Sequence, residues 1–332
     1  MLTLIDLDGN EHRLQGPTPD ELAAATGWVL KPEGLCRGEV CVPLLGRTIL
    51  DDAGNVDLAA WASALGLLLA QDPVEAVAAL ATSAAERSRS LTSGTAPHLT
   101  LPDVNGNPVS FDDFSGHKRV LVTWASWCGC RHELGGWQRL QDELASSGLK
   151  LFSVALDASP EDARPWIEAV APTYPVAVDT AHVTAERFGI TNVPSVVWID
   201  EDDQIVKPPT IAPGDDQFVD FTQIDANRHH DALRAWVDHG ELPESATAEP
   251  PQRTDDEQLA LAERRIAAWL QRGGRTDAAR AHLATAQELS PWDWTVRRGG
   301  IALTGGDPFL GDEFTEFWAK WDGSGRPGYT PT

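Results

Sequence analysis

The chain has 332 residues, and its 50 acidic and 26 basic side chains give a formal net charge of -24. This charge repels phosphate backbones and anionic lipids, so it argues against nucleic-acid or membrane partners. There is no apolar run of about 18 residues and no secretory signal, which predicts a cytoplasmic protein. The length predicts two or three domains. The 4 cysteines are too few for a disulfide scaffold, so each pair has to be explained by reactivity, a metal site or chance.

Residues 1–94 are predicted to form an α+β segment. Apolar and polar residues alternate weakly at the N-terminus before the turn Asp8-Gly9-Asn10, which predicts a strand. Proline and acidic residues near position 19 indicate a helix start. The expected elements are a strand at 2–7, a helix from Pro19, a hairpin at 34–43, and helices at 57–69 and 73–87.

Residues 95–240 alternate short apolar runs with amphipathic stretches, a pattern typical of βαβ units. The run at 119–125 is expected to be a buried parallel strand, and 129–147 the helix that follows it. The other expected strands are 151–156, 175–178, 195–200 and 204–206, and the other expected helices are 160–170, 181–188 and 227–239.

The last part of the chain is expected to be helical. Residues 241–256 contain several prolines and acidic residues and are predicted to be a linker. Two amphipathic helices in 257–332, separated by Gly273-Gly274, resemble one tetratricopeptide hairpin. Since one repeat rarely folds alone, this tail is expected to pack on the rest of the chain. Its tryptophans are expected to be packing residues; they are Trp292, Trp294, Trp318 and Trp321.

The strongest chemical signal is Trp124-Ala125-Ser126-Trp127-Cys128-Gly129-Cys130-Arg131, where a predicted strand meets a predicted helix. A cysteine at a helix start faces unpaired backbone N–H groups and the positive end of the helix dipole. Both favour the thiolate, which is the nucleophilic form. Arg131 adds positive charge if it points back toward the sulfur. Cys128 is therefore the candidate nucleophile and Cys130 the candidate resolving cysteine.

Residues 96–206 resemble thioredoxin-like redoxins of the ResA/TlpA and alkyl hydroperoxide reductase superfamily. The resemblance rests on 101–106, 120–131, 175–179, 188–194 and 198–200. It implies a thioredoxin-like α/β fold, a central mixed sheet flanked by helices, here with an N-terminal α+β extension and the helical tail. It also implies a cis Val193–Pro194 bond beside the cysteines and substrate contacts by Trp127 and Val193. Glu133 matches the acid of the family's Cys-Arg-x-Glu segment, as a proton carrier or as a solvated helix residue.

The spacing of the two cysteines departs from the family pattern. The family usually has Cys-x-x-Cys, whereas Cys128 and Cys130 are two residues apart. This form resembles a group of redoxin selenoproteins in which selenocysteine takes the first position. Because residues two apart on a helix point to nearly opposite sides, a Cys128–Cys130 disulfide requires residues 128–130 to lie partly outside the helix. Such a disulfide is expected to be readily reduced. Gly135-Gly136 replaces the family's proline, and a glycine pair still permits a kink.

Cys36 and Cys41 form a second pair. If the hairpin loop has four residues, they lie opposite each other and could bond; if the loop is Arg37-Gly38, they are offset diagonally and a disulfide becomes hard. They are either a resolving pair for Cys128 or two small buried residues. The spacing of the 4 cysteines matches no common zinc pattern, so no metal or cofactor is expected.

Three functions are compatible with these features. The first is a thiol–disulfide oxidoreductase that exchanges electrons with a protein or small-molecule disulfide or thiol, with a thioredoxin-type or low-molecular-weight thiol as reductant. The second is a thiol peroxidase, although Ala125 stands where a peroxiredoxin has threonine. The third is a redox-sensing adaptor whose helical tail binds a partner.

Overall fold

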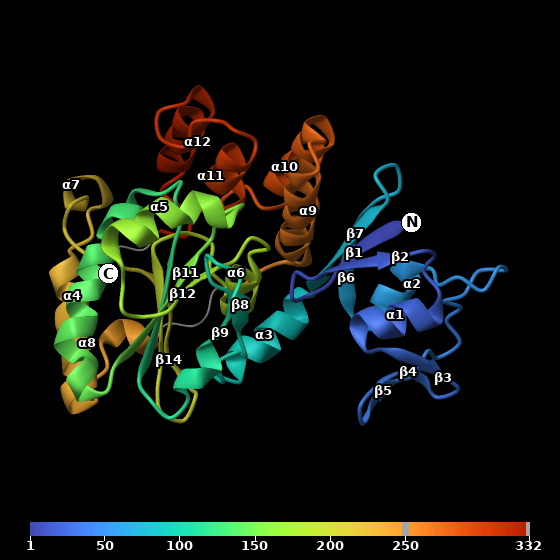
Figure 1. The fold of residues 1–332 in the computed structure, drawn as a ribbon, viewed down its shortest axis with the longest axis horizontal. Helices are drawn as coiled ribbons and strands as arrows, with labels where there is room; N and C mark the ends of the chain where they lie inside the picture. Colours follow the sequence, from blue (N-terminus) through green and yellow to red (C-terminus); the bar gives the residue numbers. More distant parts are fainter. Residues whose placement is uncertain (248–251, 330–332) are drawn as a thin grey trace. The chain divides into compact units, whose positions relative to one another are not determined.

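The computed structural model describes residues 1–247 and 252–329, which divide into two units by their internal contacts (Figure 1). The first unit comprises Met1–Ser88 with Gln252–Pro291, and the second comprises Arg89–Pro251 with Trp292–Thr332. The predicted tail is therefore shared, since its first two helices belong to one unit and its last two to the other. Within the described residues, no helix combines the length and apolar character that a bilayer crossing requires.

The first unit contains a sheet of order β2-β1-β7-β6 and a small sheet of order β3-β4-β5. Its strands are β1 (Leu2–Ile5), β2 (Glu11–Leu14), β3 (Val29–Lys31), β4 (Gly34–Arg37), β5 (Val40–Val42), β6 (Leu67–Asp72) and β7 (Val77–Thr82). Its helices are α1 (Pro19–Thr26), α2 (Leu58–Ala64), α9 (Asp255–Arg272) and α10 (Thr276–Leu289), while α3 (Ala84–Thr92) crosses the boundary between the units.

The prediction of helices over 57–69 and 73–87 is wrong for the end of the first and most of the second, where β6 and β7 form an antiparallel hairpin. Both faces of β7 are buried. Ala78 and Leu80 pack in one apolar cluster, and Val77, Ala79 and Ala81 pack in another beside α9. Alternating burial on two faces suits a strand, and small side chains let a helix approach closely, so tertiary packing overrides the helix propensity of alanine.

Helices α9 and α10 pack against each other as a helical hairpin, as the pattern predicts. Helix α9 also packs against β6 and β7. Helix α9 begins at a capping box, in which Thr254 accepts from the Glu257 N–H and the Glu257 carboxylate accepts from the Thr254 N–H. The likeness to a tetratricopeptide repeat stays a prediction. Residues 248–251 of the predicted linker lie outside the described residues, and its preceding part holds the short 3-10 turn Glu244–Thr247.

The second unit contains a five-stranded mixed sheet of order β12-β11-β10-β13-β14. Strands β10, β11 and β12 are parallel to one another, and β13 and β14 continue the sheet in antiparallel pairing. Helices α4 and α8 lie side by side along it, and α6 lies across the sheet from them (Figure 1). The sheet strands are β10 (Arg119–Trp124), β11 (Lys150–Ala155), β12 (Val176–Val178), β13 (Ser195–Ile199) and β14 (Ile205–Ile211).

This architecture is the expected mixed sheet flanked by helices. Strand β10 is buried at all six positions, as the continuous apolar run predicts for a central strand. The remaining elements are the hairpin β8 (Thr100–Pro102) and β9 (Pro108–Ser110), the helices α4 (Leu134–Leu144), α5 (Pro160–Val170), α6 (Val183–Phe188), α7 (Val219–Thr222), α8 (Ala226–His239), α11 (Trp294–Leu303) and α12 (Asp312–Gly323), and the 3-10 turns Phe111–Phe114, Gly129–Glu133 and Ala145–Ser147.

Candidate active site

The loop that carries the cysteines is fixed to the end of the neighbouring strand. After β10, the Ser126 hydroxyl donates to the Asp157 carboxylate at 2.6 Å, and the Ser126 N–H donates to the same group. The indole N–H of Trp127 donates to the Leu156 carbonyl at 2.9 Å. Since both acceptors directly follow β11, the edge of the sheet sets the position of Cys128.

Cys128 lies just before the helical segment and not inside it. Its backbone is extended, with φ -114° and ψ 149°, and its sulfur accepts a hydrogen bond from the Cys130 N–H at 3.3 Å. The segment Gly129–Glu133 is 3-10 helical, and the α-helix begins only at Leu134. The start of this segment therefore lies outside the α-helix, as a bond between the two sulfurs requires. In this structure both thiols are free, and the two residues are only 6% and 3% exposed.

The surroundings of Cys128 favour its thiolate. Burial by itself raises the pKa of the Cys128 thiol, but hydrogen bonds from Cys130 and the positive charges of Arg298 and Arg131 outweigh burial. Together they lower the pKa to about 7. About half of the Cys128 thiol is therefore ionised near neutral pH, which suits a nucleophile.

Cys130 has the opposite character. Burial raises the pKa of its thiol well above the ordinary value, the hydrogen bond and the negative charge of Cys128 raise it further, and Glu133 does so when it is ionised. Cys130 therefore stays protonated at neutral pH and supports the Cys128 thiolate as a hydrogen-bond donor. The two cysteines of one motif are thus prepared for different roles.

Glu133 is a buried acid at the end of the 3-10 segment that follows Cys128. Burial and the negative charge of Cys128 raise the pKa of its carboxyl to about 8, although it accepts a hydrogen bond from the Gly214 N–H at 3.1 Å. This contact depends on glycines, because a Cβ on Gly136 would lie 1.8 Å from the Gly214 carbonyl oxygen. The second glycine of Gly135-Gly136 therefore admits the loop that binds Glu133. The solvated alternative for Glu133 does not hold, since the residue is 2% exposed.

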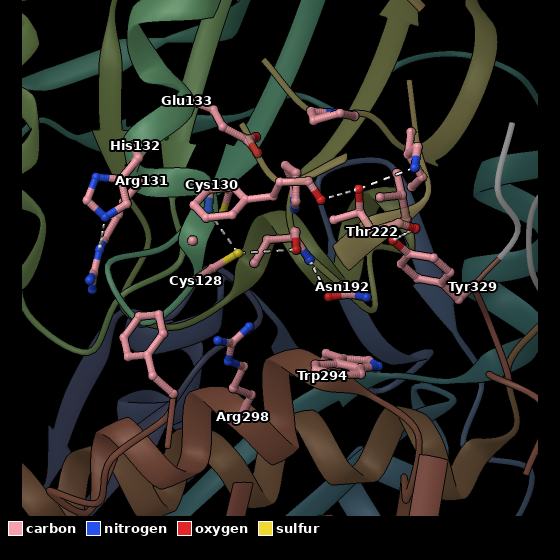
Figure 2. Close-up of a pocket in the computed structure, with 18 of the residues that line it drawn as sticks. Cys128, Cys130, Arg131, His132, Glu133, Asn192, Thr222, Trp294, Arg298 and Tyr329 are labelled. Carbon is pink, nitrogen blue, oxygen red and sulfur yellow. Dashed lines mark hydrogen bonds between the residues drawn. The ribbon is translucent and has the colours of Figure 1, made fainter. Parts of the chain in front are cut away.

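Arg131 contributes less charge to the sulfur than the sequence suggested. Its guanidinium donates to the Ser126 carbonyl at 2.6 Å and stacks over the rings of Trp166 and Phe309. Its effect on the pKa of Cys128 is smaller than that of Arg298, which comes from α11. Arg298 was missed by sequence reasoning, and no local pattern marks it, because only the tertiary fold brings α11 to the cysteines (Figure 2).

Val193 and Pro194 lie beside the cysteines. The Val193–Pro194 bond is cis, and the Cys128 thiol, when protonated, donates to the Val193 carbonyl at 3.5 Å. The side chain of Asn192 accepts from the Val193 N–H and orders this turn. Val193 and Pro194 both line the cavity next to Cys128. Trp127 is not among the described residues that line the cavity. Its ring lies beside Gly299 of α11.

The cavity has a volume of about 480 Å³ and belongs entirely to the second unit. One side is formed by the redoxin-like part of the unit, and the other by α11, α12 and the segments that follow each of them (Figure 2). Trp294, Trp318 and Trp321 pack together as expected, and they also line this cavity.

Cys36 and Cys41 belong to the other unit and form a disulfide. They lie directly opposite each other in the β4–β5 register, where Arg37 pairs with Val40. The turn is thus Gly38-Glu39, and the alternative with an Arg37-Gly38 turn does not hold. Cys36 is buried and Cys41 is exposed. Among the described residues, no group of three His, Cys, Asp or Glu side chains is arranged to hold a metal ion.

Comparison with known proteins gives the same domain. The sequence profile of the AhpC/TSA family matches residues 93–207. The thioredoxin-like protein YneN of Bacillus subtilis is 32% identical over 112 residues, which are 32% of this chain and 64% of the relative. ResA of Bacillus thuringiensis, a thiol-disulfide oxidoreductase, is 25% identical over 113 residues, 34% of this chain and 65% of the relative. The chain thus spans just under two thirds of these two relatives.

Residues 93–207 form a thioredoxin-like redoxin domain. Peroxiredoxin Bcp of Escherichia coli is also similar, with 28% identity over 146 residues that cover 43% of this chain and 92% of the relative. Among solved structures, the thioredoxin domain of a thiol-disulfide oxidoreductase from Bacteroides vulgatus aligns with a TM-score of 0.35 at 21% identity, over 43% of this chain and 95% of the other. The domain carries the Cys128 motif, while α11 and α12 lie beyond its matched residues.

Proposed function

We propose that this protein is a thiol–disulfide oxidoreductase with Cys128 as the nucleophile and Cys130 as the resolving cysteine. The observation that carries the proposal is the contrast between two free thiols of one motif. The pKa of Cys128 is lowered to about 7, and that of Cys130 is raised well above the ordinary value. Disulfide exchange needs one thiolate that attacks the substrate and a second thiol that later resolves the mixed disulfide.

In the first step, the Cys128 thiolate attacks one sulfur of the substrate disulfide. A Cys128–substrate bond forms, the substrate S–S bond breaks, and the departing thiolate takes a proton from solvent. In the second step, the deprotonated Cys130 sulfur attacks the Cys128 sulfur, which forms the Cys128–Cys130 disulfide and releases the second substrate thiol. The protein dithiol is oxidised by two electrons and the substrate disulfide is reduced by two.

Glu133 is proposed to accept the proton of Cys130. The thiolate of Cys128 helps to raise the pKa of Glu133 to about 8. When Cys128 enters the mixed disulfide its charge disappears, so the pKa of Glu133 falls and the carboxylate form becomes more populated. The base is thus generated after the first step, when Cys130 has to lose its proton.

Cys36 and Cys41 are proposed as a second redox pair that exchanges electrons with Cys128. Their disulfide bridges a short hairpin, and the exposed Cys41 offers a sulfur that a thiolate can attack. A thioredoxin-type or low-molecular-weight thiol would return the protein to its dithiol form.

Trapping of the mixed disulfide tests the assignment of the two cysteines. Reduced full-length protein is treated with bis(2-hydroxyethyl) disulfide, and the adducts are located by peptide mass spectrometry without reduction. We expect Cys130→Ser to accumulate the adduct on Cys128, and Cys128→Ser to lose disulfide reduction. An adduct trapped on Cys130 in the Cys128→Ser variant would mean that the roles are reversed. The Cys36→Ser/Cys41→Ser double variant is the control for the second pair.

A peroxidase is the second candidate, since the similarity to peroxiredoxin Bcp extends over 92% of that protein. In this case peroxide would oxidise Cys128 to a sulfenic acid, and Cys130 would resolve it with release of water. Consumption of hydrogen peroxide with dithiothreitol as reductant separates the two functions. Turnover of peroxide faster than of disulfides would favour the peroxidase.

A further inference from the structure

We infer that the cavity beside Cys128 binds a low-molecular-weight disulfide that has an apolar, preferably aromatic, body and a carboxylate. This inference rests on the proposed function and specifies its substrate class. A volume of about 480 Å³ is in the range of small-molecule sites. The wall contains Cys128, a largely apolar surface and two arginines, Arg131 and Arg298, of which Arg298 acts more strongly on the Cys128 sulfur (Figure 2).

The helices α11 and α12 restrict access to the sulfur. The Trp294 N–H donates to the Thr191 carbonyl at 2.8 Å, and the Tyr329 hydroxyl donates to the Thr222 carbonyl at 3.0 Å. Gly299 lets α11 approach Trp127, since a Cβ at this position would lie 3.3 Å from the indole ring. Cys128 is only 6% exposed in this setting. Because the sulfur is little exposed and lines a cavity, a small disulfide that enters this cavity reaches it more readily than a disulfide whose two flanking chains must follow.

The wall selects an apolar body for the substrate. Most of the side chains that α11, α12 and their flanking segments place in it are aromatic, and Phe218 adds another ring from the opposite side. Aromatic faces bind flat rings by offset or edge-to-face stacking, and they offer no hydrogen-bond partners to a polar chain. The aromatic residues of the wall on the C-terminal side are Trp294, Phe309, Phe314, Trp318, Trp321 and Tyr329.

Arg298 selects a negative charge. Its Nε donates to the Pro308 carbonyl at 2.8 Å, and its guanidinium lies over the rings of Phe309 and Phe314. Among the described residues, no carboxylate forms an ion pair with it. In the reduced protein the Cys128 thiolate balances this charge, but the mixed disulfide is neutral. Asp307 then still acts on Arg298 through its charge but does not form an ion pair with it, and a substrate carboxylate supplies a directly paired counter-ion.

The reaction follows the two steps given above. One substrate disulfide and the Cys128/Cys130 dithiol give two substrate thiols and the Cys128–Cys130 disulfide, so a reduced protein needs no further reductant for one turnover. The carboxylate takes no part in electron transfer. It holds the substrate at Arg298 through the attack and while Cys130 resolves the mixed disulfide.

Two disulfide probes of different charge test the inference. The anionic probe is 5,5′-dithiobis(2-nitrobenzoate) and the neutral probe is 4,4′-dithiodipyridine, and stopped-flow absorbance follows thiol release from each. The reduced full-length protein carries Cys36→Ser/Cys41→Ser, so that Cys128 and Cys130 are its only thiols. We expect Arg298→Met to lower the ratio of the rate constants, anionic over neutral, by about tenfold, as for loss of one charge-assisted bond.

The ratio removes the effect of Arg298 on the ionisation of Cys128, because a less ionised thiol reacts more slowly with both probes. Arg297→Met is the matched control, since it removes the same charge from the same helix but faces Phe317. An equal fall of the ratio in both variants, or no fall with Arg298→Met, would overturn the inference, as would accelerated reduction of insulin disulfides by the full chain. Retention of the fast phase in Cys128→Ser would instead overturn the proposed function itself.

Discussion

Single residues of the motif show how position and not residue type sets chemistry. Cys128 and Cys130 are both buried thiols, but Cys128 receives hydrogen bonds and lies near two arginines, whereas Cys130 lies near the negative charge of Cys128 and near Glu133, which is mostly protonated at pH 7. The sequence predicts Cys128 as the nucleophile because a strand end followed by a helix start is visible in the pattern. It assigned the helping charge to Arg131, since the contribution of Arg298 depends on packing between segments far apart in the chain.

Glu133 gives a test at the scale of one residue. Because burial raises its pKa to about 8, the folded protein retains the Glu133 proton at pH 7, while the unfolded chain, with an ordinary pKa near 4.5, releases it. The contribution of Glu133 to the free energy of unfolding is fully present below the pKa of the unfolded chain. It is lost as the pH rises from that pKa to the pKa in the folded protein, by about 1.4 kcal/mol per pH unit. Glu133→Gln should therefore raise the free energy of unfolding at pH 7 by about 3 kcal/mol.

Urea denaturation at pH 4 and pH 7 measures this difference, which should vanish at pH 4. The same variant should slow the resolving step, because an amide cannot accept the proton of Cys130. Glu143→Gln in α4, the helix that follows Glu133, is the control, because the hydrogen bond and charge of Arg234 lower the pKa of Glu143. A loss of stability in Glu133→Gln at pH 7 would contradict a protonated Glu133.

At the scale of elements, the start of α4 depends on a close backbone contact. Gly136 lies against Gly214, and a Cβ there would meet the carbonyl oxygen at 1.8 Å. The adjacent Gly135 is a natural control, because its Cβ would meet only the end of Arg139, at 3.8 Å. The sequence showed that a glycine pair replaces the family's proline, but it could not show which of the two glycines is required.

We expect Gly136→Ala to lower the free energy of unfolding by about 3 kcal/mol, as overpacking does, and to displace the loop that binds Glu133. Gly135→Ala should leave stability unchanged or raise it by about 0.5–1 kcal/mol, since alanine is the better helix former. Thermal and urea denaturation of the two variants measure the contrast. Equal effects of the two substitutions would mean that helix propensity, and not the approach of Gly214, decides this position.

The β6–β7 hairpin shows where the pattern fails at this scale. The alanine-rich sequence of β7 favours a helix by propensity, but its residues are buried alternately on two faces against different clusters. This burial depends on α9, which follows much later in the chain. The strands of the redoxin domain were predicted more closely because their apolar runs are bounded by turns and amphipathic helices.

At the scale of the whole molecule, the order of the chain does not match its compact units. The sequence predicted an N-terminal segment, a redoxin domain and a separate helical tail. The structure instead places α9 and α10 with the N-terminal segment, and α11 and α12 with the redoxin domain. The pattern indicated the helices but not their partners, because amphipathic faces specify that a surface is buried and not which surface covers it. The cavity beside Cys128 depends on this sharing of the tail.

The ionisation of Cys128 joins these scales, since it requires the sheet edge, the start of the 3-10 segment and α11 together. The most direct test is the pH dependence of iodoacetamide alkylation, followed at each cysteine by peptide mass spectrometry in the full chain. The rate at Cys128 should rise with a midpoint at about pH 7, as its lowered pKa requires, and the midpoint should move upward in Arg298→Met, while Cys130 stays unreactive through this range. A midpoint near that of an ordinary cysteine, or earlier alkylation of Cys130, would contradict the account.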